Sequence, residues 1–185
     1  MTKHKDQRIG VFIDVSNMYH SAKNLYQAKV NFKKILEIAT AERKLIRAIA
    51  YVIKSQTFEE QGFFDALIKQ GFELKIKNLQ LFFGGEKKGN WDIGMAIDSI
   101  KLANRLDAVI LITGDGDFCP LIDYLKENKG CQVEVIAFSE TASSKLIEMA
   151  DDFIDLSKNK NKVLIKNEKP LFRSQQIIKP YGTKK

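Results

Sequence analysis

The sequence predicts a single α/β domain in which a mostly parallel sheet of about five strands lies between two layers of helices. Three observations predict it: the chain of 185 residues fits one domain, short apolar runs alternate with segments of helical periodicity, and internal repeats are absent. Repeated strand–helix units require right-handed crossovers, which place helices on both faces of a parallel sheet. We therefore expect a three-layer sandwich.

The first half of the chain contains three expected strands and three expected helices. Residues 9–14 (IGVFID) form a short apolar run, and Ser16 is the expected cap of a helix that continues to about residue 28. Residues 31–41 place apolar side chains on one face of a second helix. Residues 45–53 (LIRAIAYVI) are the second strand, and 57–70 form a helix that Gly71 ends. Residues 72–77 (FELKIK) alternate as a third strand, which 79–83 could extend.

The second half repeats this alternation. A polar, glycine-rich loop over 84–90 precedes a helix over 91–105, whose apolar residues, including Ile93 and Ile97, lie mostly on one side. Residues 108–113 are the fourth strand, and a helix over 118–128 ends at Gly130. Residues 133–138 (VEVIAF) are the fifth strand, 142–150 form a short helix, and 153–156 are a candidate edge strand.

Composition narrows the class of protein. No run of 18 or more apolar residues occurs, and the N-terminus lacks the long apolar stretch of a signal peptide, so we expect no membrane span. Cys119 and Cys131 lack a CxxC spacing, which favours two buried thiols in a cytoplasmic protein. The histidines, His4 and His20, lie outside zinc-binding motifs, which argues against a zinc site.

The net charge of +7 is concentrated at the C-terminal end. Residues 157–185 hold nine basic side chains and a single acid, Glu168, so that residues 1–156 are nearly neutral. We place the domain in 1–156 and treat 157–185 as a basic tail or extension. A basic tail attracts polyanions such as RNA. The alternative is a solvated end without a specific partner.

Acidic side chains gather at expected strand ends. Asp14 closes the first strand, and Asp115 and Asp117 follow the fourth in the segment TGDGD. Ligands of parallel sheets bind outside the carboxyl ends of the strands, so we expect these acids to meet there, joined by Asp92 at a helix start. Because neighbouring carboxylates repel, such a cluster favours a hard cation such as Mg²⁺. The alternative is that each acid is a turn or helix-capping residue.

Further residues near this edge are candidates for binding substrate. Asn17 could direct its amide at a ligand water or a phosphate oxygen, and Lys88, with its neighbour, could offset substrate charge. Ser143 and Ser144 open a helix whose exposed backbone N–H groups could hold a phosphate. Asp98 is expected to point to a different side of its helix. The lysines could equally be a solvated face.

Three segments resemble, in order, the signature blocks of the NYN domain in its bacterial LabA-like branch: 10–17 (GVFIDVSN), 87–98 (KKGNWDIGMAID) and 111–118 (LITGDGDF). Residues 133–138 and 143–156 are also similar to that branch. The resemblance spans about 9–156 and implies a PIN-like fold with a Mg²⁺- or Mn²⁺-dependent ribonuclease site. It implies a metal site whose residues here are Asp14, Asp92, Asp115 and Asp117.

The same resemblance bears on three other positions. Asn17 matches the family's accompanying amide, and Asp98 matches a further acidic position of the second block. Thr113 stands where many members carry serine, and its hydroxyl could touch a ligand or cap the turn. The basic tail after residue 157 is not part of the family pattern.

The leading hypothesis is a metal-dependent endoribonuclease that acts on RNA, with single-stranded RNA as the expected form. The alternative is an RNA-binding or regulatory module that keeps the acidic pocket but cuts weakly, which the nearly neutral body favours. A phosphatase ranks last, because Asp14 is followed by Val15 and Ser16 rather than by a DxD pair. A homodimer through apolar surface near Phe82 and Phe83 is a further hypothesis.

Overall fold

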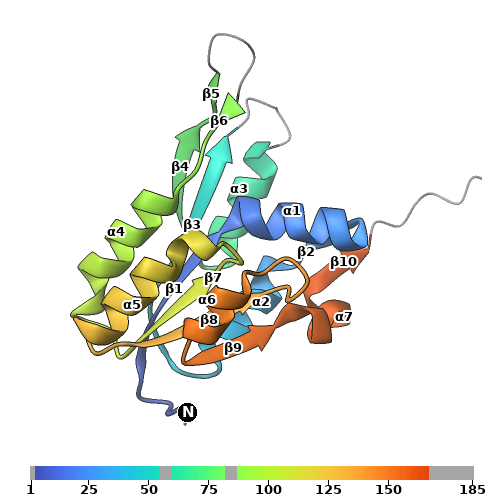
Figure 1. Cartoon of the computed structure of the whole chain (residues 1–185). Coiled ribbons are helices and arrows are strands. Elements are labelled where there is room, and N and C mark those ends of the chain that lie inside the picture. The colour runs from blue at the N-terminus through green and yellow to red at the C-terminus, as the bar shows by residue number, and fades with distance from the viewer. Residues whose placement is uncertain (1–2, 55–59, 82–86, 167–185) are drawn as a thin grey trace, which may run out of the picture.

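The computed structural model describes residues 3–54, 60–81 and 87–166. Its centre is a six-stranded sheet in which every strand pair is parallel, in the order β4-β3-β1-β7-β8-β9 (Figure 1). The strands are β1 (Arg8–Asp14), β3 (Lys44–Lys54), β4 (Glu73–Asn78), β7 (Ala108–Ile112), β8 (Gln132–Ala137) and β9 (Asp152–Asp155). The expected α/β class is confirmed, and the sheet has six strands instead of about five because β9 pairs at its edge.

Helices cover both faces of this sheet. They are α1 (Val15–Tyr26), α2 (Phe32–Thr40), α3 (Glu60–Lys69), α4 (Asp92–Ala103), α5 (Cys119–Glu127) and α6 (Ser144–Met149). Buried residues of α1, α2 and α3 belong to one hydrophobic cluster, and those of α4, α5 and α6 belong to another. The chain is therefore a three-layer sandwich, with α1 and α4 on opposite faces (Figure 1).

The central strand β1 shows why these residues form this core. Val11 and Ile13 belong to the α1 side and Phe12 to the α4 side, and all three are fully buried. This alternation follows from the two-residue period of a strand that is covered on both faces. Complete burial of each such side chain contributes about 1.5–3 kcal/mol to folding.

The strand order creates a crevice at the carboxyl end of β1. The chain begins in the centre with β1, builds outward through β3 and β4, and then returns to the other side of β1 with β7. Where the order reverses, the connections after β1 and β7 leave in opposite directions, and this is where ligands bind in open α/β sheets. Asp14 ends β1, and the TGDGD segment follows β7.

The region between α1 and α2 differs from expectation. Ser16 is not the cap of α1: Asp14 is, and its side chain accepts a hydrogen bond from the Asn17 N–H group. The helix ends before Gln27, which has a φ of 51°, and the next three residues form the short strand β2 (Ala28–Val30). We expected the first helix to continue to about residue 28, and we expected no strand between the two helices.

Regular structure continues beyond residue 156, where we expected the domain to end. A 3-10 turn (Leu156–Asn159) leads into α7 (Lys160–Val163) and β10 (Leu164–Lys166), which pairs antiparallel with β2. Val163 is fully buried in the core on the α1 side. The folded body therefore includes the first ten residues of the segment treated as a tail.

Two expectations concern segments that the structure describes only in part. Within the expected strand extension and the following loop, β5 (Gln80–Leu81) pairs antiparallel with β6 (Lys87–Lys88), and residues 82–86 lie outside the described residues. Phe82 and Phe83, on which the homodimer hypothesis rests, lie outside the described residues, as do residues 57–59 of the third expected helix.

A buried ion pair joins the opposite, amino-terminal end of the sheet. The Arg43 guanidinium donates to both carboxylate oxygens of Glu134 on β8, at 2.5 and 3.0 Å, and both side chains are fully buried. Arg43 also donates to the carbonyl oxygen of Ala39. Lys3 forms ion pairs with Glu134 and with Asp152, at 3.1 and 2.8 Å.

Two expectations from composition can be compared with the structure. Cys119 and Cys131 are both free and buried, as expected. Among the described residues, the structure contains no helix with the length and apolar character that a membrane crossing requires.

Candidate metal centre

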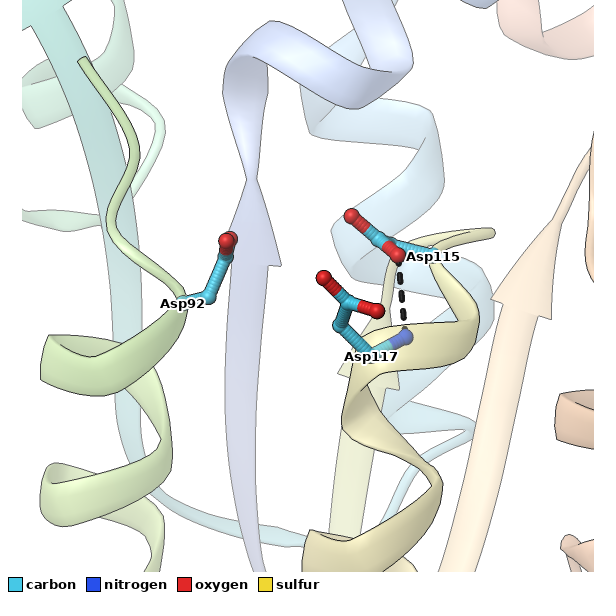
Figure 2. A group of neighbouring side chains, drawn as sticks. All are labelled: Asp92, Asp115 and Asp117. Carbon is cyan, nitrogen blue, oxygen red and sulfur yellow. Dashed lines mark hydrogen bonds between the residues drawn. The ribbon is translucent and has the colours of Figure 1, made fainter. Parts of the chain in front are cut away.

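Three aspartates converge at the crevice. Asp92, Asp115 and Asp117 each offer one carboxylate oxygen, and these three oxygens lie within 4.8 Å of one another. Figure 2 shows Asp92, at the start of α4, facing Asp115 and Asp117 across the end of β1. Three carboxylates at this spacing are a donor set that suits a hard divalent cation.

The segment after β7 holds two of these acids in a self-capped turn. The Asp115 side chain accepts a hydrogen bond from the Asp117 N–H group at 2.9 Å and so caps the short 3-10 helix η1 (Gly116–Phe118). Thr113 is fully buried, and its hydroxyl oxygen accepts the Asp115 N–H group at 3.2 Å. Thr113 thus caps the turn, which is one of its two expected roles, and its contact with a ligand stays a prediction.

Asp14 lies beside this group but is not one of the three. Burial raises the pKa of Asp14, and the charges of Asp92 and Asp115 raise that pKa further, which shows that these acids share one electrostatic environment. Hydrogen bonds from the N–H groups of Asn17 and Ser16 lower the same pKa. Asp14 therefore caps α1 and adds negative charge at the cluster, while its contact with a metal stays a prediction.

Asn17 connects the two loops of the crevice. Its Oδ1 accepts a hydrogen bond from the Gly114 N–H group at 3.0 Å, which ties the first turn of α1 to the TGDGD segment. This bond engages the Oδ1 of Asn17, and the expected contact of its amide with a ligand water or a phosphate oxygen stays a prediction. Because the bond holds the backbone of Gly114, Asn17 helps to position the two acids that follow it, Asp115 and Asp117.

The start of α6 packs against the same segment. The Ser143 N–H group donates to the Gly114 carbonyl oxygen at 2.9 Å, so it is not free to hold a phosphate as we expected. A Cβ at Gly114 would lie 3.0 Å from the Ala142 Cα, and one at Gly116 would lie 2.9 Å from the Ser143 Oγ. Glycine at both positions lets the two segments approach this closely.

Asp92 is held at the start of α4 by its neighbours. The Asn90 side-chain amide donates to Asp92 Oδ2 at 2.5 Å, and the Trp91 indole donates to the Val52 carbonyl oxygen at 3.0 Å. A Cβ at Gly94 would lie 2.5 Å from the Trp91 ring, so the indole fills the space above that glycine. Sequence reasoning missed Asn90, because an Asn two residues before a helix start gives no distinctive signal.

The acids of the cluster repel one another, and the charge of Lys77 offsets this repulsion only in part. In the part of the chain that the structure describes, none of Asp92, Asp115 and Asp117 forms an ion pair with lysine or arginine. Burial raises the pKa of Asp92, and the charges of Asp115 and Asp117 raise it further, while Lys77 lowers it. The residues present therefore fit a divalent cation, which would remove this repulsion.

Asp98 makes its contacts outside the cluster, and two further expected residues stay predictions. Asp98 accepts a hydrogen bond from the Tyr51 hydroxyl at 2.8 Å and forms an ion pair with Lys75 at 2.7 Å, so it points to a different side, as expected. Lys88 pairs with Gln80 through its backbone in β6, and its proposed contact with substrate stays a prediction. The structure likewise leaves the expectation for the Ser144 N–H group a prediction.

Comparisons with known proteins show what this chain is similar to. The sequence profile of the family described as "NYN domain" matches residues 8–157. The low amplitude and bright protein LabA of Synechococcus elongatus is 26% identical over 189 residues, which cover 95% of this chain and 98% of LabA.

Solved structures are also similar. A Vibrio parahaemolyticus protein of unknown function, VPA0982, is 30% identical, with a TM-score of 0.80 over 89% of this chain and 100% of that chain. The T5 D15 protein co-crystallised with metal ions has a TM-score of 0.43 and 14% identity, over 77% of this chain and 59% of that one.

Proposed function

Because this chain belongs to the NYN domain family, we propose that it is a metal-dependent endoribonuclease that hydrolyses RNA phosphodiester bonds at the aspartate cluster. The observation that carries the proposal is the convergence of three carboxylate oxygens within 4.8 Å at the crevice where β1 and β7 end. RNA as the partner and the cytoplasm as the compartment belong to the same proposal.

Asp92, Asp115 and Asp117 would hold Mg²⁺ or Mn²⁺, with Asp14 contributing directly or through water. When bound, the cation supplies Lewis-acid chemistry, which neutralises charge that develops on a phosphodiester and makes nearby water more acidic. The carboxylates must be ionised to do this, and the raised pKa values of Asp14 and Asp92 make cation binding tighten as the pH rises.

The remaining residues of the site prepare it. Asn17, Thr113 and Ser143 hold the TGDGD segment through hydrogen bonds to its backbone, so the carboxylates need little rearrangement when a cation and substrate arrive. Lys88 and Ser144 remain proposed contacts to substrate phosphate. In this proposal Asn17, Thr113 and Ser143, which the sequence suggested as substrate-binding residues, act as positioning residues.

The proposal is tested by cleavage of single-stranded RNA with Mn²⁺ or Mg²⁺. We expect Asp115→Asn to lower kcat by about 100-fold or more, the scale of losing one electrostatic group from an active site. Asp123→Asn, an exposed aspartate on α5 outside the cluster, is the matched control and should cleave like the parent. Equal cleavage by the parent and by Asp115→Asn would refute the proposal.

The second candidate, an RNA-binding module that cuts weakly, is favoured by the charge distribution. Residues 1–156 are nearly neutral, whereas residues 157–185 carry the excess of basic side chains. A chain that ends at Lys166 keeps every described element and removes five of the nine basic side chains together with Glu168. Loss of RNA affinity with retained cleavage of short RNA supports an enzyme with a basic tether, whereas retained binding without cleavage by any divalent ion supports the module.

A further inference from the structure

A groove between α4 and α5 opens directly beside the aspartate cluster. Asp92 and Asp117 lie at its margin, so it is continuous with the candidate metal centre. All its other lining residues are apolar or aromatic, among them Ile93 and Ile100 from α4 and Tyr124 from α5. The groove therefore combines an apolar wall with access to the three carboxylates.

The apolar wall contains side chains that the fold does not bury. Ile93 is 75% exposed and Tyr124 is 38% exposed. Burial of a large aliphatic side chain normally stabilises the folded state, but Ile93 is mostly exposed and therefore contributes little to stability. An apolar surface next to a polar site is typical of a ligand-binding groove.

The chemistry of the groove selects its occupant. It has no basic side chain among its lining residues, so it offers nothing to a phosphate, whereas a flat apolar base can pack against isoleucine and stack on tyrosine. A second hollow beside Asp117 is lined by Asp123 and Lys145, whose opposite charges suit a base less well. The apolar groove is thus the better of the two for a base.

We propose that the groove between α4 and α5 binds an unpaired nucleobase of the RNA strand whose phosphodiester lies at the aspartate cluster. The inference rests on the proposed nuclease function and adds the form of its substrate. A paired and stacked base has its faces covered by neighbouring bases, so only an unpaired nucleotide can insert. Single-stranded RNA is then the preferred substrate because of this groove.

The kinetic test uses two RNA oligonucleotides. Each carries a single abasic nucleotide, which lies on one side of the mapped cleavage position in the first and on the other side in the second. Because stacking on a single base is worth roughly 5- to 100-fold in affinity, we expect removal of the bound base to lower kcat/KM by at least about fivefold. Ile93→Ser should lower kcat/KM for intact RNA by a similar factor and leave the abasic substrate unchanged. Ile68→Ser, which alters an isoleucine that is 56% exposed on α3, is the matched control.

A binding test does not depend on cleavage. With isoleucine methyl groups labelled for NMR, adenosine 5′-monophosphate in the presence of Mg²⁺ should shift the signals of Ile93 and Ile100. Ribose 5-phosphate, which lacks the base, should not shift them, and the exposed Ile68, Ile76 and Ile165 serve as internal controls.

The outcomes separate this inference from the proposed function. A protein that cleaves RNA but shows no base-dependent shift at Ile93 overturns the base site and leaves the nuclease standing. A base-dependent shift in a protein that cuts no RNA supports the base site and refutes the nuclease. A shift of Ile93 that depends on protein concentration, without nucleotide, would show that a second copy covers the groove, and the inference would then be wrong.

Discussion

Replacing Asp92 with asparagine is expected to stabilise the metal-free protein and to abolish most of its response to Mg²⁺. In the parent, three carboxylates repel one another, and none of them forms an ion pair with lysine or arginine in the described residues. Asparagine keeps the size of the side chain and an oxygen for the bond from Asn90. The substitution therefore removes charge with little change in packing.

The magnitude follows from the spacing of the three oxygens. Because the side chains are partly exposed, we take an effective dielectric constant of about 40–80, at which two unit charges 4.8 Å apart repel by about 0.9–1.7 kcal/mol. Neutralising Asp92 removes two such repulsions, and loses about 0.3–1 kcal/mol of favourable interaction with the α4 dipole. The net gain is about 1–3 kcal/mol, which raises Tm by about 2–10 °C for a protein of this size.

The effect has a defined dependence on pH. The pKa of Asp92 is raised in the folded protein, so the destabilisation it causes is absent below the pKa of the unfolded chain and grows as the pH rises through the folded value. The parent and Asp92→Asn should therefore have similar Tm values below about pH 4 and differ most near neutrality. Thermal unfolding in EDTA across this pH range measures the difference.

The same unfolding experiment with Mg²⁺ completes the test. Mg²⁺ at 100 times its Kd should stabilise the parent by about 2.7 kcal/mol and Asp92→Asn by much less. Asp123→Asn, on an exposed turn of α5, should keep the parent response and change stability by less than about 0.5 kcal/mol. A lower Tm of Asp92→Asn in EDTA at neutral pH, or a Mg²⁺ response equal to that of the parent, would refute the electrostatic reasoning.

Three further predictions concern how the site and sheet are held. Asn17→Ala should lower the free energy of unfolding by about 1 kcal/mol and weaken Mn²⁺ binding in calorimetry, whereas Asn24→Ala, exposed on α1, should change neither. Gly94→Ala should weaken Mn²⁺ binding, because the new Cβ would lie only 2.5 Å from the Trp91 indole and would displace it. Gly62→Ala, whose Cβ would meet no atom within 4 Å, should instead raise the free energy of unfolding by about 0.5–1 kcal/mol. Arg43→Met should lower the free energy of unfolding, measured by urea denaturation, by about 3–5 kcal/mol, because it leaves the buried Glu134 carboxylate without its guanidinium. An unchanged free energy of unfolding would contradict this.

The convergence of acids could be predicted because it follows from topology. Asp14 and the TGDGD segment end strands of a parallel sheet, and the carboxyl ends of neighbouring strands share one edge. The way each acid is held could not be predicted in the same way. Capping by Asp14 rather than Ser16 depends on a shift of two residues in the helix start, which apolar periodicity does not resolve.

Non-local contacts account for most of the remaining differences. The strands β2 and β10 have three residues each and pair across most of the chain, so neither has a local pattern strong enough to reveal its partner. Periodicity correctly placed a helix over residues 91–105, but it does not show how far a neighbouring helix covers its apolar side. The exposure of Ile93 and Ile97 therefore follows only from the structure, which shows where α5 lies.

The central position of β1 also governs how the polypeptide assembles as it is synthesised. One side of β1 pairs with β3, which ends at residue 54, but its other side must wait for residues 108–112 to leave the ribosome. During that interval the middle strand of the future sheet presents a row of unsatisfied backbone groups, which attract strands of other chains. A nascent or truncated polypeptide that ends between these two points is consequently prone to self-association, and the crevice that gathers the aspartates forms late.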